Sequence, residues 1–262
     1  MSLWSTPAWP EQPQGVRTAF TLRGLNGTGG ASAGPYRRFN LACHVGDAPE
    51  AVEANRRLLR TRLELPTEPA WLKQVHGSRV LDLDPAAPVG PAPEADASVT
   101  RTAGTVCVVQ VADCLPVLFA SRSASCVGAA HAGWRGLAAG VLEATIKAFG
   151  VAPAELVAWL GPSIGPEHFE VGDEVREAFV RSDPDAEVAF TRNARGRWQC
   201  DLPGIASARL RRAGIGSVAA EGACVYADAQ RFYSYRRDGQ CGRMAALIWL
   251  APAEPLKGHR SP

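Results

Sequence analysis

Three side chains of the types that bind metal ions stand at the ends of short apolar runs in this sequence. His76 closes one apolar stretch, Cys114 follows the Val-rich run 105–112, and His131 follows the run 126–130. Such runs, bounded by Pro, Ser and Gly, are typical of buried strands, and strand ends present side chains to clefts. Imidazole nitrogen and thiolate sulfur suit zinc, and a three-residue set leaves a fourth position for water or substrate. The pattern therefore predicts an open metal site.

The same residue types also have common structural roles and a second chemical one. A cysteine at a strand end is usually a small buried residue, and an isolated histidine is usually a hydrogen-bonded core residue. Alternatively, Cys114 is a thiolate nucleophile with His131 or His76 as its base, as in cysteine hydrolases. Asp113 is expected to orient a ligand imidazole, to act as a general base, or to cap local backbone amides. A binding module without catalytic activity is the remaining alternative.

Five motifs resemble the YfiH-like family, which is also called the laccase-domain or polyphenol oxidase family and includes the peptidoglycan editing factor. In chain order they are QVHG (74–77), ADC-x-P (112–116), HAGWRG (131–136), GPSIGP (161–166) and SYRR (234–237). The resemblance covers roughly residues 20–250. It implies that His76, Cys114 and His131 bind one zinc ion.

The resemblance also implies an activity. Members of the family phosphorolyse adenosine, inosine and methylthioadenosine to base and sugar phosphate, and they deaminate adenosine. Another family role is an amidase that releases L-serine from UDP-N-acetylmuramoyl-L-serine, a peptidoglycan precursor. The older family name implies copper, which a His2Cys set can hold. A multicopper centre needs more imidazoles than the five of this chain, which has no HxH pair, so zinc is expected and copper is the alternative.

Phosphorolysis requires a site for the phosphate anion. An arginine beside the free amides at a helix start suits that role, and Arg135, four residues after His131, is our first candidate. We predict a catalytic group of Asp113, Cys114 and Arg135. The other candidates for contacts with substrate are Asn40, Gln74, Tyr235, Arg236 and Arg237.

Composition favours a small-molecule enzyme. The chain has 262 residues, 46% of them hydrophobic, and a net charge of +2 from 28 basic and 26 acidic residues. With nearly equal numbers of basic and acidic residues, the chain has no strong electrostatic attraction to nucleic acids or membranes. No apolar run is long enough to span a bilayer. The seven cysteines are scattered and include no CxxC pair, which favours free thiols in a reducing compartment. We therefore expect a cytoplasmic protein with a small-molecule substrate; the sequence does not indicate an oligomeric state.

The order of predicted elements indicates a mixed α+β fold. We expect an extended N-terminal arm (1–15), a single catalytic domain (16–251) and a mobile tail (252–262). The family resemblance implies layered mixed β-sheets flanked by helices, similar to the catalytic domain of cytotoxic necrotising factor. Besides the runs above, strands are predicted at 16–22, 79–83, 96–100, 117–121, 156–160, 198–202, 218–225, 232–235 and 243–250.

Helices are predicted from apolar periodicity and capping residues. They comprise a helix capped by Asp47 that ends near Glu64, and helices at 137–149, 170–181 and 203–213. The segment 161–165, GPSIG, matches the GxSxG pattern of a nucleophile elbow. Pro166 is incompatible with the helix that must follow the serine of an elbow, so Ser163 is not expected to be a nucleophile.

Overall fold

A computed structural model describes residues 3–24, 29–84 and 90–252. The predicted tail therefore lies outside the described residues except for Pro252. The strands are β1 Trp4–Ser5, β2 Val16–Thr21, β3 Val80–Asp82, β4 Ala97–Thr100, β5 Val106–Val111, β6 Leu115–Ser121, β7 Val127–Ala132, β8 Leu156–Leu160, β9 Glu170–Val171, β10 Phe190–Arg192, β11 Trp198–Cys200, β12 Ser217–Ala220 and β13 Met244–Leu250. The α-helices are α1 Pro49–Arg62, α2 Trp134–Ala138, α3 Val141–Phe149, α4 Asp173–Val180, α5 Leu202–Arg212 and α6 Tyr235–Asp238.

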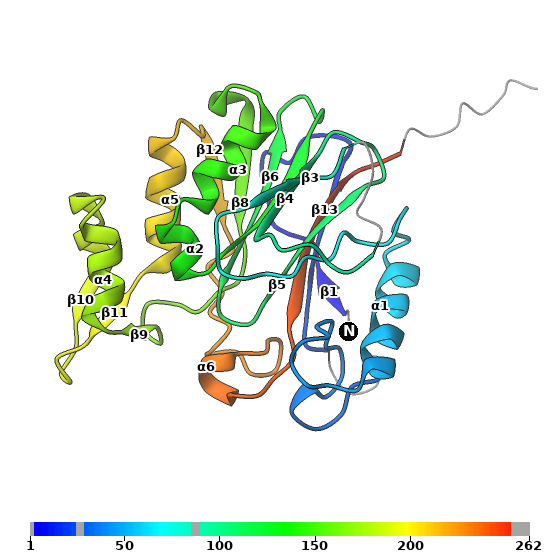
Figure 1. Cartoon of the computed structure of the whole chain (residues 1–262), viewed down its shortest axis with the longest axis horizontal. Helices are drawn as coiled ribbons and strands as arrows, with labels where there is room; N and C mark the ends of the chain where they lie inside the picture. Colours follow the sequence, from blue (N-terminus) through cyan, green and yellow to red (C-terminus); the bar gives the residue numbers. More distant parts are fainter. Residues whose placement is uncertain (1–2, 25–28, 85–89, 253–262) are drawn as a thin grey trace, which may run out of the picture.

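Two β-sheets pack face to face at the centre of the molecule (Figure 1). One is an antiparallel sheet with strand order β1-β2-β13-β5, and the other is a mixed sheet with order β12-β8-β6-β7-β4-β3. Consecutive strands β5 and β6 lie in different sheets, so the bend between them crosses from one layer to the other. The bend between β5 and β6 therefore lies where segments that are far apart in the sequence come together.

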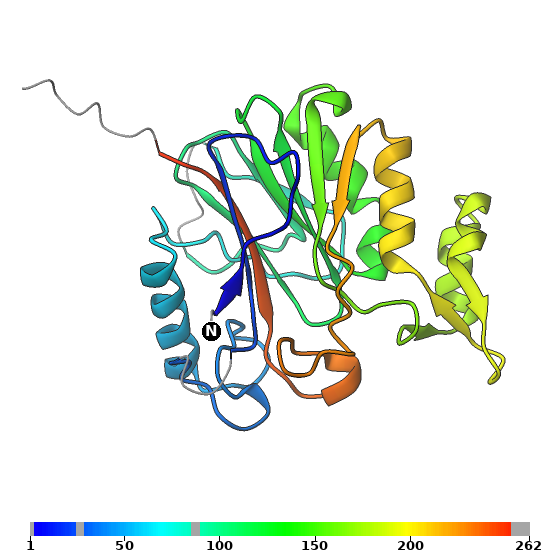
Figure 2. The same cartoon turned by 180° about the vertical axis from the view of Figure 1, so that it is seen from behind.

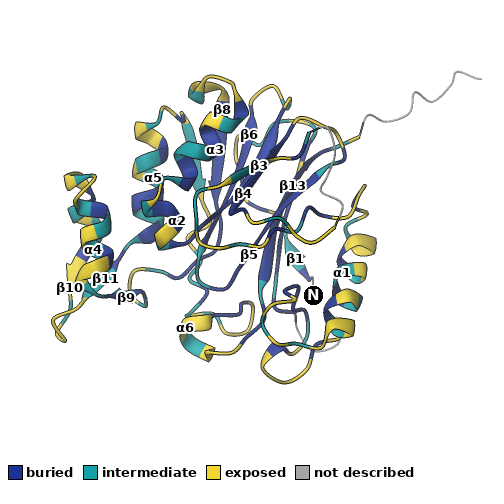
Figure 3. Cartoon of the chain, viewed as in Figure 1, coloured by how far each residue is buried: buried dark blue, intermediate teal, exposed yellow. Residues whose placement is uncertain are grey.

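Alternating side chains of the four-stranded sheet enter two cores. In β13, Met244, Ala246 and Ile248 contact the core between the sheets, whereas the residues between them face the other side. That second core lies under α1, which contributes Leu59. Because both faces are covered, β5 and β13 are apolar at nearly every position, and the burial colouring of Figure 3 shows a dark centre.

Helices complete the outer layers. α3 packs on β7 and β4, α5 packs beside β12, and α1 covers the opposite side of the molecule (Figures 1 and 2). The small sheet β10-β11-β9 packs with α4 and forms a lobe at one end. The structure is thus a layered α+β fold, as expected from the sequence. The likeness to cytotoxic necrotising factor stays a prediction. Within the described residues, no helix is long and apolar enough to cross a membrane.

The N-terminal segment is attached to the body of the protein. β1 pairs antiparallel with β2, with Trp4 opposite Thr21. Leu3 and Trp9 are each 6% exposed. Part of the predicted arm is therefore an edge strand of the four-stranded sheet.

Two predicted helix starts were wrong. Asp47 does not cap α1, whose N-cap is Ala48 with Pro49 as the first helical residue. Asp47 instead accepts hydrogen bonds from the side chains of Ser32 and Asn40, at 2.6 and 2.9 Å. The helix predicted from residue 170 begins at Asp173, because residues 170–171 pair with β11 as strand β9.

Other corrections concern breaks within predicted elements. The single helix predicted at 137–149 is two helices, because Gly140 adopts a left-handed conformation with φ of 88° between α2 and α3. The strand predicted at 232–235 is a buried loop followed by α6, whose N-cap Ser234 accepts a hydrogen bond from the amide of Arg237. The strand predicted at 218–225 is limited to β12.

Candidate metal centre and its pocket

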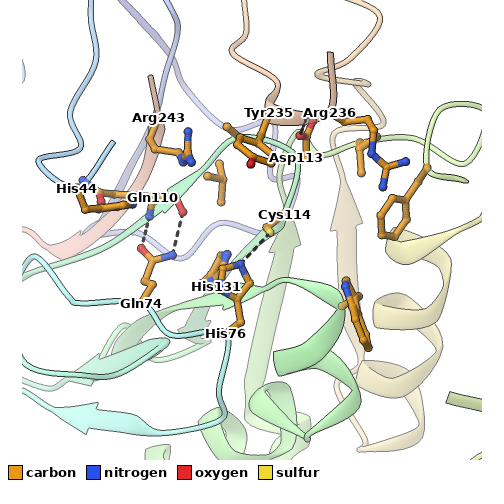
Figure 4. Close-up of a pocket in the computed structure, with 15 residues that line it drawn as sticks. His44, Gln74, His76, Gln110, Asp113, Cys114, His131, Tyr235, Arg236 and Arg243 are labelled. Carbon is orange, nitrogen blue, oxygen red and sulfur yellow. Dashed lines mark hydrogen bonds between the residues drawn. The ribbon is translucent and has the colours of Figure 1, made fainter. Parts of the chain in front are cut away.

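Three segments bring the predicted metal ligands together. His76 lies before β3, Cys114 lies in the bend between the two sheets, and His131 lies in β7. One donor atom from each lies within 4.8 Å of the others, and Cys114 Sγ is 3.8 Å from His76 Nε2 (Figure 4). Among the described residues, no other group of three His, Cys, Asp or Glu side chains is placed to bind a metal ion.

The donor set fits a tetrahedral metal ion. With Zn–S near 2.3 Å and Zn–N near 2.0–2.1 Å, a tetrahedral angle places sulfur and nitrogen about 3.6 Å apart. The observed 3.8 Å between Cys114 Sγ and His76 Nε2 is close to that value. One thiolate, two imidazoles and a fourth position facing a pocket are the composition of an open metal site. Imidazole and thiolate also accept copper, so the donors alone do not select the metal.

Asp96 positions both histidines. Its side chain accepts hydrogen bonds from the backbone amides of Val75, His76 and Gly77, at 3.1, 2.8 and 2.7 Å. Its Oδ1 is also 2.9 Å from His131 Nδ1, which leaves Nε2 as the metal-facing nitrogen. Burial by itself would raise the pKa of Asp96, but the hydrogen bonds from His131 and the backbone amides lower it overall. Asp96 is therefore an ionised anchor for the metal ligands.

The segment that carries His76 is held in place on both sides. The side-chain amide of Gln74 pairs with the backbone of Gln110. Its nitrogen donates to Gln110 O at 2.9 Å, and its oxygen accepts a hydrogen bond from Gln110 N at 2.7 Å. His76 itself has a φ of 61°, an uncommon conformation for a residue with a side chain. Three amides bound to one carboxylate stabilise this conformation and direct the imidazole toward Cys114.

Cys114 and His131 stabilise each other's charged forms. Burial opposes ionisation of the Cys114 thiol, but the charge and hydrogen bond of His131 lower its pKa to about 6. Burial likewise opposes the imidazolium, but the Cys114 charge and the hydrogen bond to Asp96 raise the pKa of His131 to about 9. Without metal, the pair is a thiolate and an imidazolium at neutral pH. A metal ion bound here takes the place of the imidazolium proton.

Two glycines of the HAGWRG motif allow the start of α2 to lie close to the segments that carry His76 and Cys114. A methyl group on Gly133 would lie 2.9 Å from Cys114 Sγ and 3.0 Å from His76 Cδ2. A methyl group on Gly136 would lie 2.7 Å from Gly77 O. All three distances are shorter than van der Waals contact. The glycines therefore let α2 pack directly against the metal ligands.

Asp113 does not orient a ligand imidazole. It has a φ of 104°, and its carboxylate accepts hydrogen bonds from the Ser234 hydroxyl at 2.5 Å and from the Arg236 amide at 2.7 Å. Burial raises its pKa. Asp113 therefore fixes α6 against the bend that carries Cys114, in agreement with the amide-capping alternative, and Asp96 holds the imidazole instead.

The metal ligands open into a cavity of about 430 Å³. Its walls combine polar and cationic groups with aromatic side chains, and Figure 4 shows His44, Gln110 and Arg243 on one side of the metal ligands and Tyr235 and Arg236 on the other. A volume of this size falls within the range of small-molecule sites. The lining residues are His44, Gln74, His76, Gln110, Val111, Ala112, Asp113, Cys114, His131, Trp134, Ile164, Phe169, Tyr235, Arg236 and Arg243.

Comparison with known proteins identifies the family. The sequence model of the family described as "Multi-copper polyphenol oxidoreductase laccase" matches residues 17–251. The chain belongs to this family. It is 49% identical to "Purine nucleoside phosphorylase PA4543" of Pseudomonas aeruginosa, with 95% of this chain and 99% of the relative covered. It is 47% identical to "Purine nucleoside phosphorylase YfiH" of Escherichia coli, with 95% and 100% covered.

Solved structures of the family share the fold. The Neisseria meningitidis protein NMB0706 superposes with a TM-score of 0.89 at 45% identity, over 96% of this chain and all of that one. The Bacillus licheniformis protein YfiH superposes with a TM-score of 0.85 at 26% identity, over 95% and 100%. The predicted resemblance to the YfiH-like family is therefore confirmed.

Some candidate residues of this laccase-like family member lie in the pocket and others do not. Gln74, Tyr235 and Arg236 line it. Arg135 is exposed and lies over the Trp134 ring, and it is absent from the lining. Asn40 is fully buried and accepts a hydrogen bond from the Arg243 amide at 2.9 Å, so it supports Arg243 rather than substrate.

Arg237 and Ser163 also have structural roles. Arg237 donates to the carbonyls of Val225, Tyr226 and Phe232 and pairs with Asp238. Ser163 is 3% exposed, and the residues after it form a turn rather than a helix, which supports the prediction that GPSIG is not a nucleophile elbow. The neighbouring Ile164 contributes to the pocket wall.

Sequence reasoning missed several residues of this site. Asp96 lies directly before β4, and β4 pairs with β7 with Ala97 opposite Ala130; this register places Asp96 beside His131. The pairing register was the signal that could have identified it. His44 and Arg243 come from a loop and a strand start far from the ligands in sequence, and only the packing of the two sheets brings them there.

Proposed function

We propose that the protein is a zinc-dependent purine nucleoside phosphorylase that acts on adenosine, inosine and methylthioadenosine and also deaminates adenosine. The observation that carries this proposal is an open His2Cys metal site in the wall of a small-molecule pocket, with arginines on both sides of it. Relatives named purine nucleoside phosphorylase at 49% and 47% identity support the substrate class.

His76, Cys114 and His131 are the residues that would hold the zinc ion. When bound, zinc supplies Lewis-acid polarisation of a substrate oxygen or lowers the pKa of a bound water. Asp96 keeps both imidazoles oriented for the metal. Such outer contacts restrict the ligand geometry and increase the basicity of the histidine.

The arginines that line the pocket are our candidates for phosphate binding. Arg243 is held by Cys241 O at 2.9 Å, and Arg236 is held by Glu170 O at 2.8 Å. Each guanidinium keeps further donors for an anion, which it can bind in bidentate fashion. Burial and the charges of Arg243 and Arg56 lower the pKa of His44, so its imidazole is a neutral hydrogen-bonding group beside this site. We assign the anion to Arg236 and Arg243, which line the pocket, rather than to Arg135, which does not.

The aromatic residues of the pocket suit a purine. Phe169 and Trp134 line the cavity, and Tyr235 lines it with 60% of its own surface exposed. Stacking of a nucleobase on an aromatic ring contributes about 1–3 kcal/mol. In the reaction, a phosphate oxygen forms a bond to C1′ of the ribose, the C1′–N9 bond breaks, and the purine leaves with a proton on its ring. The arginines offset the charge of the attacking phosphate.

The test is product analysis with zinc-loaded protein. Adenosine with phosphate is expected to give adenine and ribose 1-phosphate, and adenosine without phosphate is expected to give inosine and ammonia. Cys114→Ala should abolish both reactions. Arg243→Ala and Arg236→Ala should each raise KM for phosphate by about tenfold or more, because each removes a charge-assisted hydrogen bond to the anion. Arg135→Ala is the matched arginine control and should leave KM for phosphate unchanged.

Two results would overturn the proposal. Release of serine from UDP-N-acetylmuramoyl-L-serine, with no adenine above the Cys114→Ala background, would assign the site to the precursor-editing amidase. Full activity in metal-free protein would assign Cys114 and His131 to a cysteine hydrolase instead.

A further inference from the structure

Cys224 and His168 form a second pair of a nucleophile and a base, outside the metal centre. The Cys224 Sγ lies 3.6 Å from Nδ1 of His168. The backbone amide of Gly165 donates a hydrogen bond to the same sulfur at 3.2 Å. Both side chains are partly exposed, and neither lines the pocket of the metal site. The sulfur thus faces a proton acceptor and a hydrogen-bond donor.

The surrounding chain holds this arrangement in place. Ser163 pairs with Cys224 in a β-bridge, in which Ser163 N donates to Ala223 O at 3.3 Å and Val225 N donates to Ser163 O at 2.9 Å. A methyl group at Gly165 would lie 3.3 Å from Sγ, so the absence of a side chain there allows the amide to reach the sulfur. This bridge fixes the backbone on both sides of the thiol.

The imidazole is fixed by a separate contact. The ring of His168 stacks on Tyr226, with centroids 4.4 Å apart and planes 25° apart. Stacking determines the plane of the imidazole and keeps Nδ1 directed at the sulfur. Tyr226 lies two residues after Cys224, so the segment that carries the thiol also orients its base, His168, which comes from a different segment.

The remaining cysteines lack this combination. Cys107, Cys126, Cys200 and Cys241 are buried, and burial raises the pKa of the Cys107 and Cys200 thiols to about 12. Cys114 belongs to the metal centre. Cys43 is exposed, so it is the natural reference for a solvent-accessible thiol in the same molecule.

A cavity of about 240 Å³ lies beside the backbone next to the pair, although neither Cys224 nor His168 is among its lining residues. Gly165, whose amide contacts the sulfur, lies in its wall, and so does Ala223, the residue before Cys224. The space is sufficient for a small reagent to approach the backbone beside the thiol. The partial exposure of Cys224 distinguishes it from a cysteine that is packed in a core.

We propose that Cys224 is a site of oxidation by hydroperoxides, with His168 as its base. His168 Nδ1 takes the thiol proton, and the sulfur attacks the terminal oxygen of the hydroperoxide. An S–O bond forms as the O–O bond breaks, and the leaving alkoxide takes the proton from the imidazolium. The cysteine is oxidised by two electrons to a sulfenic acid, and the hydroperoxide is reduced to an alcohol, or to water when hydrogen peroxide is the reagent. The proposal is independent of the reaction assigned to the metal site.

The first test compares thiols within the unmodified, zinc-saturated protein. The protein is treated with limiting hydrogen peroxide and a dimedone probe for sulfenic acid, and separately with iodoacetamide at pH 7. Peptide mass spectrometry then gives a rate for each cysteine. Cys224 is expected to react at least about tenfold faster than Cys43, because an imidazole and a donating backbone amide both contact the Cys224 sulfur. Equal or faster labelling of Cys43 would overturn the proposal.

The second test removes the base. His168→Asn keeps a polar atom near the position of Nδ1 but cannot take the proton, and it should slow labelling of Cys224 about tenfold. Tyr226→Phe retains the stacking ring and should stay within twofold of the parent. Circular dichroism and zinc content establish that both variants are folded. An unchanged Cys224 rate in folded His168→Asn would show that the imidazole does not activate the thiol.

Discussion

One carboxylate, that of Asp96, connects the two histidine ligands at the level of single residues. It binds the three amides of the His76 segment and the ring of His131. Removing its charge while keeping its shape tests that connection. Asp96→Asn is expected to weaken zinc affinity by about 10- to 100-fold, as is usual for a partner of a metal-binding histidine.

Chelator competition measures this change. Glu94→Gln is the matched control, because Glu94 lies two residues away and its exposed side chain pairs with Lys73 rather than with a ligand. Its zinc affinity should equal that of the parent protein. Equal affinity in Asp96→Asn would mean that the carboxylate does not orient the ligands.

The pKa values of Cys114 and His131 predict how metal affinity depends on pH. Cys114, with a pKa of about 6, is already a thiolate above that pH, whereas His131 keeps a proton up to about pH 9. A metal ion must displace that proton, so between these limits zinc affinity should rise about tenfold per pH unit. Below pH about 6 the thiol also becomes protonated, and the affinity should fall more steeply.

Zinc binding measured against a chelator of known proton affinity, from pH 5 to pH 8.5, checks this expectation. The number of protons released, measured by calorimetry in buffers of different ionisation enthalpy, gives an independent value. A pH-independent affinity between pH 6 and 8 would contradict the assignment of these ligands.

The grouping of the three candidate ligands could be predicted from the sequence, because each lies in a motif shared with the family and closes or follows an apolar run. Their positioning residues could not. Asp96 precedes a strand like many aspartates, and its role depends on strand register. Arg135 illustrates the opposite error: nearness in sequence to His131 suggested a role in the pocket, but the start of α2 directs it to solvent.

At the scale of elements, the close packing of α2 against the ligands makes Gly133 a sensitive position. Its φ of −62° is accessible to alanine, so substitution introduces no backbone strain. The added methyl group would lie 2.9 Å from Cys114 Sγ. Gly133→Ala is therefore expected to keep the fold but to lose most bound zinc and most activity.

Zinc content and thermal unfolding of purified Gly133→Ala separate these effects. Gly216→Ala is the control, because the nearest atom to its new methyl group lies 3.8 Å away, at the end of the Arg122 side chain. It should retain zinc and its melting temperature. Normal zinc content in Gly133→Ala would show that the ligand cluster can expand without cost.

Local sequence determined most strands but fewer helix boundaries. β5, β6, β8 and β13 are apolar along nearly their whole length, so they were predicted without knowledge of their partners. Helix breaks depended on conformations that periodicity does not report, such as the left-handed Gly140. α6 forms where Asp113 binds the amide of Arg236, a contact between residues distant in sequence.

For the whole molecule, stability should depend on the cores on both faces of β13. Leu247 is fully buried in the core under α1. Leu247→Ala is expected to lower the free energy of unfolding by about 2–5 kcal/mol, since it removes buried methyl groups and leaves a cavity. Urea denaturation of the zinc-loaded protein measures this loss.

Val188→Ala is the surface control, because Val188 is 91% exposed. Its free energy of unfolding should stay within about 0.5 kcal/mol of the parent. A similarly small effect of Leu247→Ala would mean that the core under α1 adds little to stability. The α+β class was predictable from element order and the layered sheets from the family resemblance. The assignment of strands to two sheets was not, because β5 and β6 are consecutive and yet separate.

The position of β13 has a consequence for protein synthesis. β13, the last strand among the described residues, lies between β2 and β5, which are made much earlier. While the ribosome is still translating, β2 and β5 lack the neighbour that pairs with both, and their apolar faces and open edges are available for aggregation. The β1-β2-β13-β5 sheet is therefore completed only once residues 244–250 have been made. Until β13 pairs with them, the backbone edges of β2 and β5 that face it remain open to pairing with other chains.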